Sequence, residues 1–241
     1  MLPMEARDPS LTVVLLAYNE AANVADAIGE HARFLEGALD DWEIVVVDDG
    51  STDETADRAA HRAGADPRIR VERHERNCGM GAGIATGIRA ATKSHFVMNA
   101  ADGQIAAAEI GALLGGLDEA DIVLTTYADR RRERGWGRDA LSRGLRRYLS
   151  LVAHIRFELE GLYLFPVDAA KRLEPKIHSS TFFYSFELVQ RGIELGLTTT
   201  SREIRVRPRA AGRSKVLRLG RIGRVARDAL AYRVSRHGER A

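Results

Sequence analysis

The sequence predicts an α/β fold in which a mostly parallel sheet is flanked by helices. Apolar runs that suit buried strands alternate with segments whose apolar residues recur at helical spacing. This alternation fills the first half of the chain and is the pattern of repeated βα units. Polar residues gather where the runs end. Because ligands of open α/β sheets bind at the carboxyl ends of the strands, the sequence places a ligand site at one edge of this sheet.

The first βα unit begins with the apolar run Leu11–Leu16, which leads into Ala17, Tyr18, Asn19 and Glu20. The next helix has one apolar face, formed by Val24, Ala27, Ile28, His31, Phe34, Leu35 and Ala38. His31 is expected to be a packed or partly exposed helix residue rather than a ligand. The polar residues that leave the strand are site candidates, and helix capping by Asn19 is the alternative.

The second unit carries the strongest local signal. The run Glu43–Val47 predicts a strand buried on both faces, and it stops at Asp48 and Asp49. Gly50 permits a sharp turn, and Ser51 and Glu54 have the spacing of a capping box, so a helix is expected to start at once and to end near Gly64. The two carboxylates suit a ribose hydroxyl or a metal; capping and solvation of the turn is the alternative.

The third and fourth units continue the pattern. Ile69–His74 predicts a short strand, and glycines at 79, 81, 83 and 87 open a helix that runs to Ala91. These glycines either offer N–H groups to an anion or permit tight packing. His95–Met98 predicts the next strand, followed by a turn in which Asp102 and Gln104 can face one cation. A short helix at Glu109–Leu117 and a strand at Asp121–Thr126 complete this half.

The second half of the chain is basic. Residues 130–147 contain eight arginines and two acidic residues, which form either a solvated face or a site for a polyanion. Nucleic acid is disfavoured because no aromatic residues interleave with these arginines on a groove-reading element. Further elements are expected as a helix from Leu141 to Val152, a strand at Leu159–Phe165, a helix from Phe182 to Ile193 with Glu187 displaced from its apolar stripe, and a strand at Glu203–Arg207. A basic loop, 209–215, and a basic amphipathic helix, Val216–Arg236, follow.

Composition sets limits on the class of protein. The length of 241 residues suits either one α/β domain or a domain with an appendage, the hydrophobic content of 45% is ample for a core, and the net charge is +2. Cys78 is the single cysteine, so an internal disulfide is excluded and a reducing compartment is favoured. The chain shows no signal-peptide pattern and no run of about 18 apolar residues. The expected location is the cytoplasm, with the inner face of a membrane as the alternative place.

Several motifs, in this order, resemble glycosyltransferase family 2, which has the GT-A fold, and in particular its branch of dolichol-phosphate mannose synthase and other polyprenyl-phosphate glycosyltransferases. They cover most of the chain: Ala17–Glu20, Val47–Ser51, Asn77–Gly87, Asp102–Gln104, Ser142–Gly144, Gly161–Phe165, Phe186–Leu188 and Arg209–Lys215. The resemblance implies a GT-A domain at 1–215, with a donor-binding half at about 10–127 and an acceptor-binding half at about 128–215. The basic helical extension then covers 216–241.

The resemblance also implies roles for individual residues. Ala17, Tyr18, Asn19 and Glu20, with Asp49, would hold the base and ribose of a sugar nucleotide, and Asp48 would support that edge. Ala101, Asp102 and Gly103 would line the diphosphate, with Asp102 and Gln104 as ligands of Mg²⁺ or Mn²⁺. Arg143, Arg209 and Lys215 would cover the donor and acceptor phosphates. The first Asp of the family's Asp-x-Asp motif is Ala100 here, which leaves the dependence on metal open.

The implied function is an inverting transfer of one sugar from a GDP- or UDP-linked donor to a polyprenyl phosphate. The Gln-x-x-Arg-Trp motif of processive members is absent, which favours a single transfer. A soluble acceptor hydroxyl is the first alternative, and it would need a base, for which Glu158, Glu160 and Glu187 are the candidates. A degenerate protein that binds nucleotide sugars without catalysis is the second alternative, suggested by Ala100. The tail helix would contact an anionic membrane surface or cap the domain.

Overall fold

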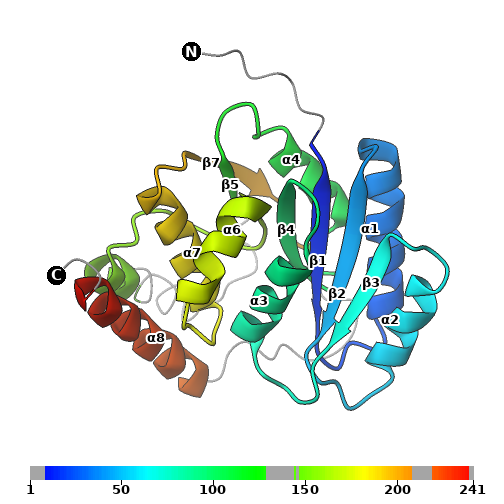
Figure 1. Cartoon of the computed structure of the whole chain (residues 1–241), viewed down its shortest axis with the longest axis horizontal. Helices are drawn as coiled ribbons and strands as arrows, with labels where there is room; N and C mark the ends of the chain where they lie inside the picture. The colour runs from blue at the N-terminus through cyan, green and yellow to red at the C-terminus, as the bar shows by residue number, and fades with distance from the viewer. Residues whose placement is uncertain (1–8, 129–143, 145–146, 208–218, 239–241) are drawn as a thin grey trace.

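A computed structural model of the chain describes residues 9–128, 144, 147–207 and 219–238. Its centre is a seven-stranded sheet with the order β3-β2-β1-β4-β6-β5-β7. The helices cover both faces of this sheet (Figure 1), with α1, α2 and α4 on one side and α3, α6 and α7 on the other. The predicted α/β fold with a mostly parallel, helix-flanked sheet is confirmed.

The first half follows the predicted βα pattern closely. Its elements are β1 (Leu11–Ala17), α1 (Val24–Ala38), β2 (Trp42–Asp48), α2 (Thr55–Ala63), β3 (Ile69–Arg73), α3 (Met80–Ala90), β4 (His95–Ala100), the 3₁₀ turn η1 (Ala107–Glu109), α4 (Ile110–Leu114) and β5 (Ile122–Tyr127). Strands β3, β2, β1 and β4 are parallel neighbours. Side chains from β1 and β2 point alternately into two apolar layers, which explains why both sequences are continuously apolar.

The second half departs from the prediction in three places. Its labelled elements are β6 (Tyr163–Pro166), α6 (Val167–Leu173), η2 (Glu174–Lys176), α7 (Phe183–Glu194), β7 (Thr199–Ile204) and α8 (Leu219–Gly238), and residues 147–153 are also helical. Strand β6 is shorter than expected because the chain turns at Gly161, whose φ is +78°. Strand β7 starts earlier than expected because Thr199 pairs with Ile122 at the start of β5. Helix α6 was not predicted.

Strand β6 runs antiparallel to both of its neighbours, β4 and β5. Its first residue therefore lies at the edge where the parallel strands end. This places the turn at 160–161 beside the segment that follows β4: a Cβ built on Gly161 would lie 2.9 Å from the Ile105 side chain. The antiparallel strand thus brings part of the second half of the chain to the predicted site edge.

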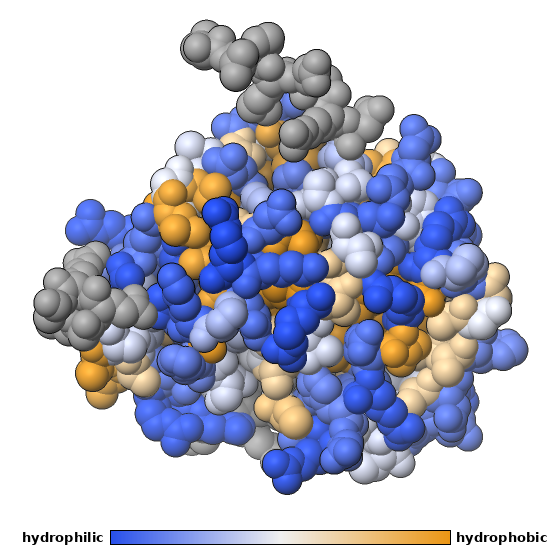
Figure 2. Space-filling model, in the orientation of Figure 1, coloured by the Kyte–Doolittle hydropathy of each residue, from blue (hydrophilic) through white to orange (hydrophobic). Residues whose placement is uncertain are grey.

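Helix α8 packs against the domain. Its residues Val225, Ala229 and Tyr232 are buried in a third apolar cluster with Leu149, Ala153, Ile155 and Phe183. The opposite side of α8 leaves Leu230 and Val234 exposed. On the face drawn in Figure 2, hydrophilic side chains cover most of the surface and the hydrophobic patches are small and separate. Among the described helices, none combines the length and the apolar character that a membrane crossing needs.

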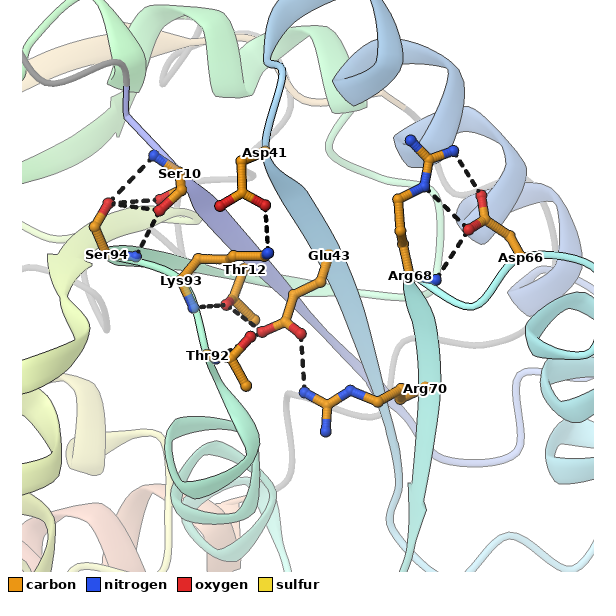
Figure 3. Close-up of polar contacts among 10 residues, drawn as sticks. All are labelled: Ser10, Thr12, Asp41, Glu43, Asp66, Arg68, Arg70, Thr92, Lys93 and Ser94. Carbon is orange, nitrogen blue, oxygen red and sulfur yellow. Dashed lines mark hydrogen bonds and ion pairs between the residues drawn. The ribbon is translucent and has the colours of Figure 1, made fainter.

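A polar network closes the edge of the sheet opposite the strand ends (Figure 3). The buried carboxylate of Glu43 accepts hydrogen bonds from Thr12 Oγ1, Thr92 N and Arg70 Nη2 at 2.7–2.9 Å. Burial acts to raise the pKa of Glu43, but these donors outweigh it and the pKa is lowered. The three donors come from β1, from β3 and from the segment before β4, and all of them bind Glu43 on β2. The buried carboxylate is therefore fully paired, and it links these segments.

Candidate functional site

The ends of β2, β1 and β4 lie side by side at one edge of the sheet. Ala17 is paired with Asp48, and Leu16 is paired with Ala100, so the end of β1 separates the acidic turn from the Asp102 segment. Adjacent strands are about 4.8 Å apart, so this edge spans roughly 10 Å from β2 to β4. The structure thus brings together the three segments that the sequence assigned to the donor: 17–20, 48–49 and 100–104.

Asp49 is almost buried, and its carboxylate organises the loop after β3. It accepts hydrogen bonds from Cys78 N and Gly79 N at 2.8 and 2.9 Å, and it pairs with His74 Nδ1 at 2.8 Å. The other nitrogen of His74 contacts Thr86 Oγ1 on α3. A carboxylate has about four acceptor positions, so room for one further donor remains.

Asp48 has no exposed surface. Its Oδ1 accepts a hydrogen bond from Ser51 N at 3.1 Å, while Oδ2 has no hydrogen-bond donor among the described residues and lies 3.3 Å from Arg73 Nε in an ion pair. The Arg73 side chain is more than half exposed, whereas the Asp48 carboxylate is fully buried. The ion pair with this surface arginine therefore compensates the buried negative charge of Asp48. The supporting role expected for Asp48 stays a prediction.

The predicted capping box is wrong. Helix α2 begins at Thr55, and its first turn is capped by Asp53, whose carboxylate accepts from Thr55 N at 3.0 Å. Ser51 Oγ instead accepts from Asn19 N at 2.9 Å. The loop from β1 crosses in front of the acidic turn, so Ser51 is used in a tertiary contact rather than in its own helix.

Asn19 and Glu20 join the two loops. Asn19 has a φ of +52°, and its side-chain oxygen accepts from Thr52 N, so it caps the neighbouring turn rather than α1. Glu20 N donates to Thr55 Oγ1, and the Glu20 carboxylate accepts from Asn23. Tyr18 lies in this loop and is half-buried. The expected nucleoside-binding segment is therefore held rigidly against the start of α2.

The glycines of the third unit serve packing. Gly79 N–H is given to Asp49, so it is not available to an anion. A Cβ on Gly81 would lie 2.5 Å from Ser179 O, and one on Gly87 would overlap Val14 on β1. The packing alternative stated for these glycines is the one that the structure supports.

The segment after β4 forms a compact turn around Asp102. The Asp102 carboxylate accepts from Gln104 N at 3.1 Å, Gly103 has a φ of +72°, and Ala101 is buried with its N–H donated to Leu16 O. Gln104 O accepts from Arg207 N at 2.7 Å. The end of the segment that follows β7 is therefore joined to this turn.

This turn fits a divalent metal modestly. Asp102 supplies one carboxylate and Gln104 one amide oxygen, and Mg²⁺ is often bound by one or two carboxylates together with substrate phosphates. A second cluster of possible ligands, Asp49, His74 and Cys78, has its ligand atoms within 4.8 Å of one another. Both Asp49 oxygens and both His74 nitrogens already have hydrogen-bond partners. This cluster is therefore a structural hydrogen-bond network, and the Asp102 turn is the better candidate for a metal that binds a diphosphate.

Three predicted phosphate-binding residues, Arg143, Arg209 and Lys215, lie outside the described residues, as does most of the arginine-rich run. Of the three candidate bases, Glu187 is buried and pairs with Arg191 at 3.0 Å and Ser179 at 2.5 Å, although it lies off the predicted apolar stripe of α7. Its charge is buried because Arg191, one turn later, pairs with it. Glu160 accepts from Tyr127 N at the site edge, and Glu158 is exposed.

Sequence reasoning missed two contributors. His74 was expected only as the end of a strand, although its place at the same edge as Asp49 was a usable signal. Glu30 on α1 accepts from Ala107 N and pairs with Arg207, and so ties the Asp102 segment to the start of the basic loop. No local pattern marks Glu30, because its partners are about 80 or more residues away along the chain.

His31 is a packed helix residue, as the sequence predicted, and it contacts Asn99 at the end of β4. It is buried; Nδ1–H donates to Ala27 O, and Nε2 accepts from Asn99 Nδ2, which also donates to Ile105 O. Burial lowers the pKa of His31, against smaller opposing effects of the Ala27 carbonyl and Glu30. The neutral ring with a proton on Nδ1 is therefore the form that this hydrogen-bond arrangement requires.

The free energy of unfolding is expected to fall as the pH drops below about 6.5, the ordinary pKa of the ring. Unfolded His31 takes up a proton there, whereas folded His31 resists it, so the unfolded state gains stability. Urea unfolding between pH 7.5 and 5.5 measures this. The H31Q variant should show a shallower loss, while H61Q, on the exposed side of α2, should match the wild type. Equal slopes for H31Q and wild type would contradict the assignment.

Comparison with known proteins places these observations in context. A family model described as glycosyl transferase family 2 matches residues 12–191. A dolichyl-phosphate beta-glucosyltransferase, ALG5C of Trichomonas vaginalis, is 28% identical over 200 residues, which cover 74% of this chain and 58% of that protein. Glycosyltransferase AglD of Haloferax volcanii is also 28% identical over 200 residues, covering 77% of this chain and 31% of its own length.

Solved structures share the fold. Glucosyl-3-phosphoglycerate synthase from Mycobacterium tuberculosis, in complex with phosphoglyceric acid, has a TM-score of 0.66 and 24% identity, covering 95% of this chain and 80% of that one. The same enzyme with Mn²⁺, uridine diphosphate and glucosyl-3-phosphoglycerate gives 0.63, again at 24% identity and with the same coverage. The predicted GT-A fold and glycosyl transferase family 2 are confirmed, while the matches span only 58% and 31% of the two curated relatives.

Proposed function

The chain belongs to glycosyl transferase family 2, and from this premise we propose that it transfers one sugar from a nucleotide-sugar donor to a polyprenyl phosphate, with inversion of the anomeric centre. The observation that carries the proposal is the meeting of Asp49, the 17–20 loop and the Asp102 turn at adjacent strand ends. Asp49 would bind the ribose hydroxyls, and the Asp102 turn, roughly 10 Å away across β1, would bind the diphosphate.

The donor would lie across the end of β1. Its base and ribose would contact Ala17–Glu20 and the remaining acceptor position of Asp49, with Asp48 beneath them. Its diphosphate would lie at Ala101–Gly103. These loops are cross-linked by hydrogen bonds, such as Asn19 N to Ser51 Oγ and Ala101 N to Leu16 O, so the donor site would need little rearrangement to bind.

A divalent cation held by Asp102 and Gln104 would supply positive charge to the leaving nucleoside diphosphate. Arg143, Arg209 and Lys215 are proposed to act on the same phosphates and on the acceptor phosphate. The hydrogen bond from Arg207 N to Gln104 O supports this for Arg209 and Lys215, because it brings Arg207, two residues before Arg209 in the sequence, to the Asp102 turn. Positive charge would then close over the leaving group from the same side as the metal.

A phosphate acceptor fits the carboxylates of this edge. A phosphate is already an anion at neutral pH, so the attack needs positioning rather than a general base. Glu187 is committed to a buried pair with Arg191, and Glu160 holds the backbone N–H of Tyr127. The alternative of an acceptor hydroxyl would rely on Glu160, which lies at the site edge. The non-catalytic alternative rests on Ala100, which removes a carboxylate from the metal site.

Transfer from radiolabelled UDP- and GDP-sugars to polyprenyl phosphate in detergent tests the proposal. Label in the organic phase, lost in the D102N variant, is the expected result. Label that remains in a water-soluble product when a panel of small hydroxyl and phosphate acceptors is supplied would replace the lipid acceptor by a soluble one. Nucleotide binding, measured by thermal shift, without transfer or donor hydrolysis would favour the non-catalytic alternative.

Restoring the missing carboxylate is expected to strengthen metal binding. Ala100 is partly exposed at the end of β4, two residues before Asp102, so the A100D variant adds a second anionic ligand. The Mn²⁺ concentration that gives half of the maximal thermal shift with nucleotide present should fall about tenfold, since affinity rises with the number of charged ligands. The A100N variant, which adds an oxygen without charge, is the control. Equal Mn²⁺ requirements for A100D and A100N would contradict the assignment of the metal to this turn.

A further inference from the structure

Helix α8 is linked to the donor edge through a buried carboxylate. Asp228, on its inner side, is 8% exposed, and its Oδ2 accepts three hydrogen bonds: from Ser180 N and Thr181 N at 3.1 Å and from Thr181 Oγ1 at 2.9 Å. These donors belong to the loop that precedes α7. A carboxylate that receives two successive backbone N–H groups fixes the path of that loop more firmly than a side-chain contact would.

The same loop is pressed against the first turn of α3. Ser180 O accepts from Gly81 N at 3.2 Å. Gly81 has no room for a side chain, because a Cβ there would lie 2.5 Å from Ser179 O, and a Cβ on Gly79 would lie 3.1 Å from Ser180 O. The contact is thus between two backbones, and a shift of the loop must move the glycine turn.

The glycine turn in turn positions Asp49. Cys78 N and Gly79 N donate to the two oxygens of its carboxylate, and Asn77 Nδ2 contacts its backbone oxygen at 3.3 Å. The other side of the 179–181 loop is fixed as well, since Ser179 Oγ bonds Glu187, which pairs with Arg191. Every link from α8 to Asp49 is therefore a short polar or backbone contact, and the hydrogen bonds at both ends of the path are partly buried.

We propose that Asp228 is a positioning residue for the donor site: it holds the 179–181 loop, which sets the glycine turn and through it the carboxylate of Asp49. Helix α8 is then part of the nucleotide-binding apparatus and not an appendage. The nucleotide effect of this inference rests on the proposed function, whereas the mechanical link can be measured without a ligand.

Loss of this carboxylate is expected to act on binding rather than on the chemical step. Asp49 would contact the nucleoside equally in the bound donor and in the transition state, so a displaced Asp49 weakens both alike. In D228A, the KM for the donor and the Kd for the free nucleotide, with UDP and GDP as probes, should rise about five- to tenfold, while kcat stays within about twofold. D228N retains an oxygen that can accept the same donors, so it should recover most of the affinity.

Hydrogen–deuterium exchange of the full chain without nucleotide tests the mechanical link. The amides of Cys78, Gly79 and Gly81 are hydrogen-bonded, and the segment 75–84 that contains them should exchange about tenfold faster in D228A than in wild type. The T181V variant removes one donor to Asp228 and keeps the backbone, so it should give a smaller change of the same kind. R233Q is the matched control, because Arg233 joins α8 to Val152 O and leaves the loop untouched.

The outcomes separate the two ideas. Faster exchange at 75–84 in D228A, together with weaker nucleotide binding and recovery in D228N, supports the proposal. Faster exchange confined to α8 and the 179–186 segment, with unchanged exchange at 75–84 and unchanged nucleotide Kd, overturns it, because Asp228 would then only anchor a loop. If wild type binds no nucleotide, the proposed function fails, and with it the effect on affinity, while exchange at 75–84 still decides the mechanical link. If D228A unfolds α8, which circular dichroism would show as a loss of helical signal, the exchange at 75–84 is compared between D228N and T181V instead. Faster exchange there in T181V than in D228N supports the mechanical link, and equal, wild-type exchange in both overturns it.

Discussion

The D102N variant is expected to lower kcat/KM for sugar transfer by roughly 10²- to 10³-fold. Asp102 is the one carboxylate of the turn after β4, and under the proposed function its charge would hold the cation that faces the leaving nucleoside diphosphate. Asparagine keeps an oxygen that can accept the hydrogen bond from Gln104 N, so the turn should persist. Initial rates at several donor and Mn²⁺ concentrations measure the effect.

The matched control is D118N, which removes the same charge from an exposed acid between α4 and β5, at the opposite edge of the sheet. Its kcat/KM should stay within about twofold of wild type, since exposed charges at such a distance are screened by salt. Melting temperatures of D102N and wild type should agree. A D102N enzyme of wild-type activity would show that the diphosphate is neutralised without this carboxylate, and the basic loop would have to carry that role alone.

The second large effect is expected for G50A, which should lower the free energy of unfolding by about 3–5 kcal/mol. Gly50 has a φ of +68°, which costs an alanine energy in any surroundings. Its Cβ would also lie 2.6 Å from Arg76 Cα and Asn77 N, and would overlap Arg76 C. The loop after β3 passes directly over the turn, and its backbone cannot move without releasing the bonds from Cys78 and Gly79 to Asp49.

Guanidinium unfolding of G50A beside G37A measures this effect. Gly37 lies in α1, and a Cβ added to it would meet nothing within 4 Å, so alanine there should be neutral or stabilising by up to about 1 kcal/mol. A G50A protein as stable as wild type would mean that the loop at 76–77 yields easily. That result would also weaken the proposal that this loop holds Asp49 in place.

The order of elements in the first half was predictable because each decision there is local. Four of the strands are short apolar or alternating runs bounded by polar turns, and α1 repeats its apolar residues with helical spacing. Parallel strands place their carboxyl ends at one edge by topology alone, so the meeting of 17–20, 48–49 and 100–104 followed from the order of elements.

One error arises where a distant segment supplies the partner. Ser51 and Glu54 have the spacing of a capping box, yet the loop from β1 uses the Ser51 hydroxyl, and Thr55 N donates to Asp53. A tertiary hydrogen bond thus outweighs a local preference worth about 1 kcal/mol. The burial of Glu187 has a more local cause, because its partners Arg191 and Ser179 lie four and eight residues away along the chain.

The sequence by itself determined the fold class and the family, because these depend on hydrophobic periodicity and on motif order. Only the tertiary structure decided that Asp49 is shared among His74, Cys78 and Gly79, that the α3 glycines serve packing, and that Asp228 of α8 accepts hydrogen bonds from the loop before α7. The hydrogen bonds of Asp49 and Asp228 join residues from 25 to 48 positions apart, the α3 glycines pack against residues still further away in the chain, and no periodicity in the sequence encodes such pairs. Their geometry exists only once the sheet has formed and the loops have closed over its edge.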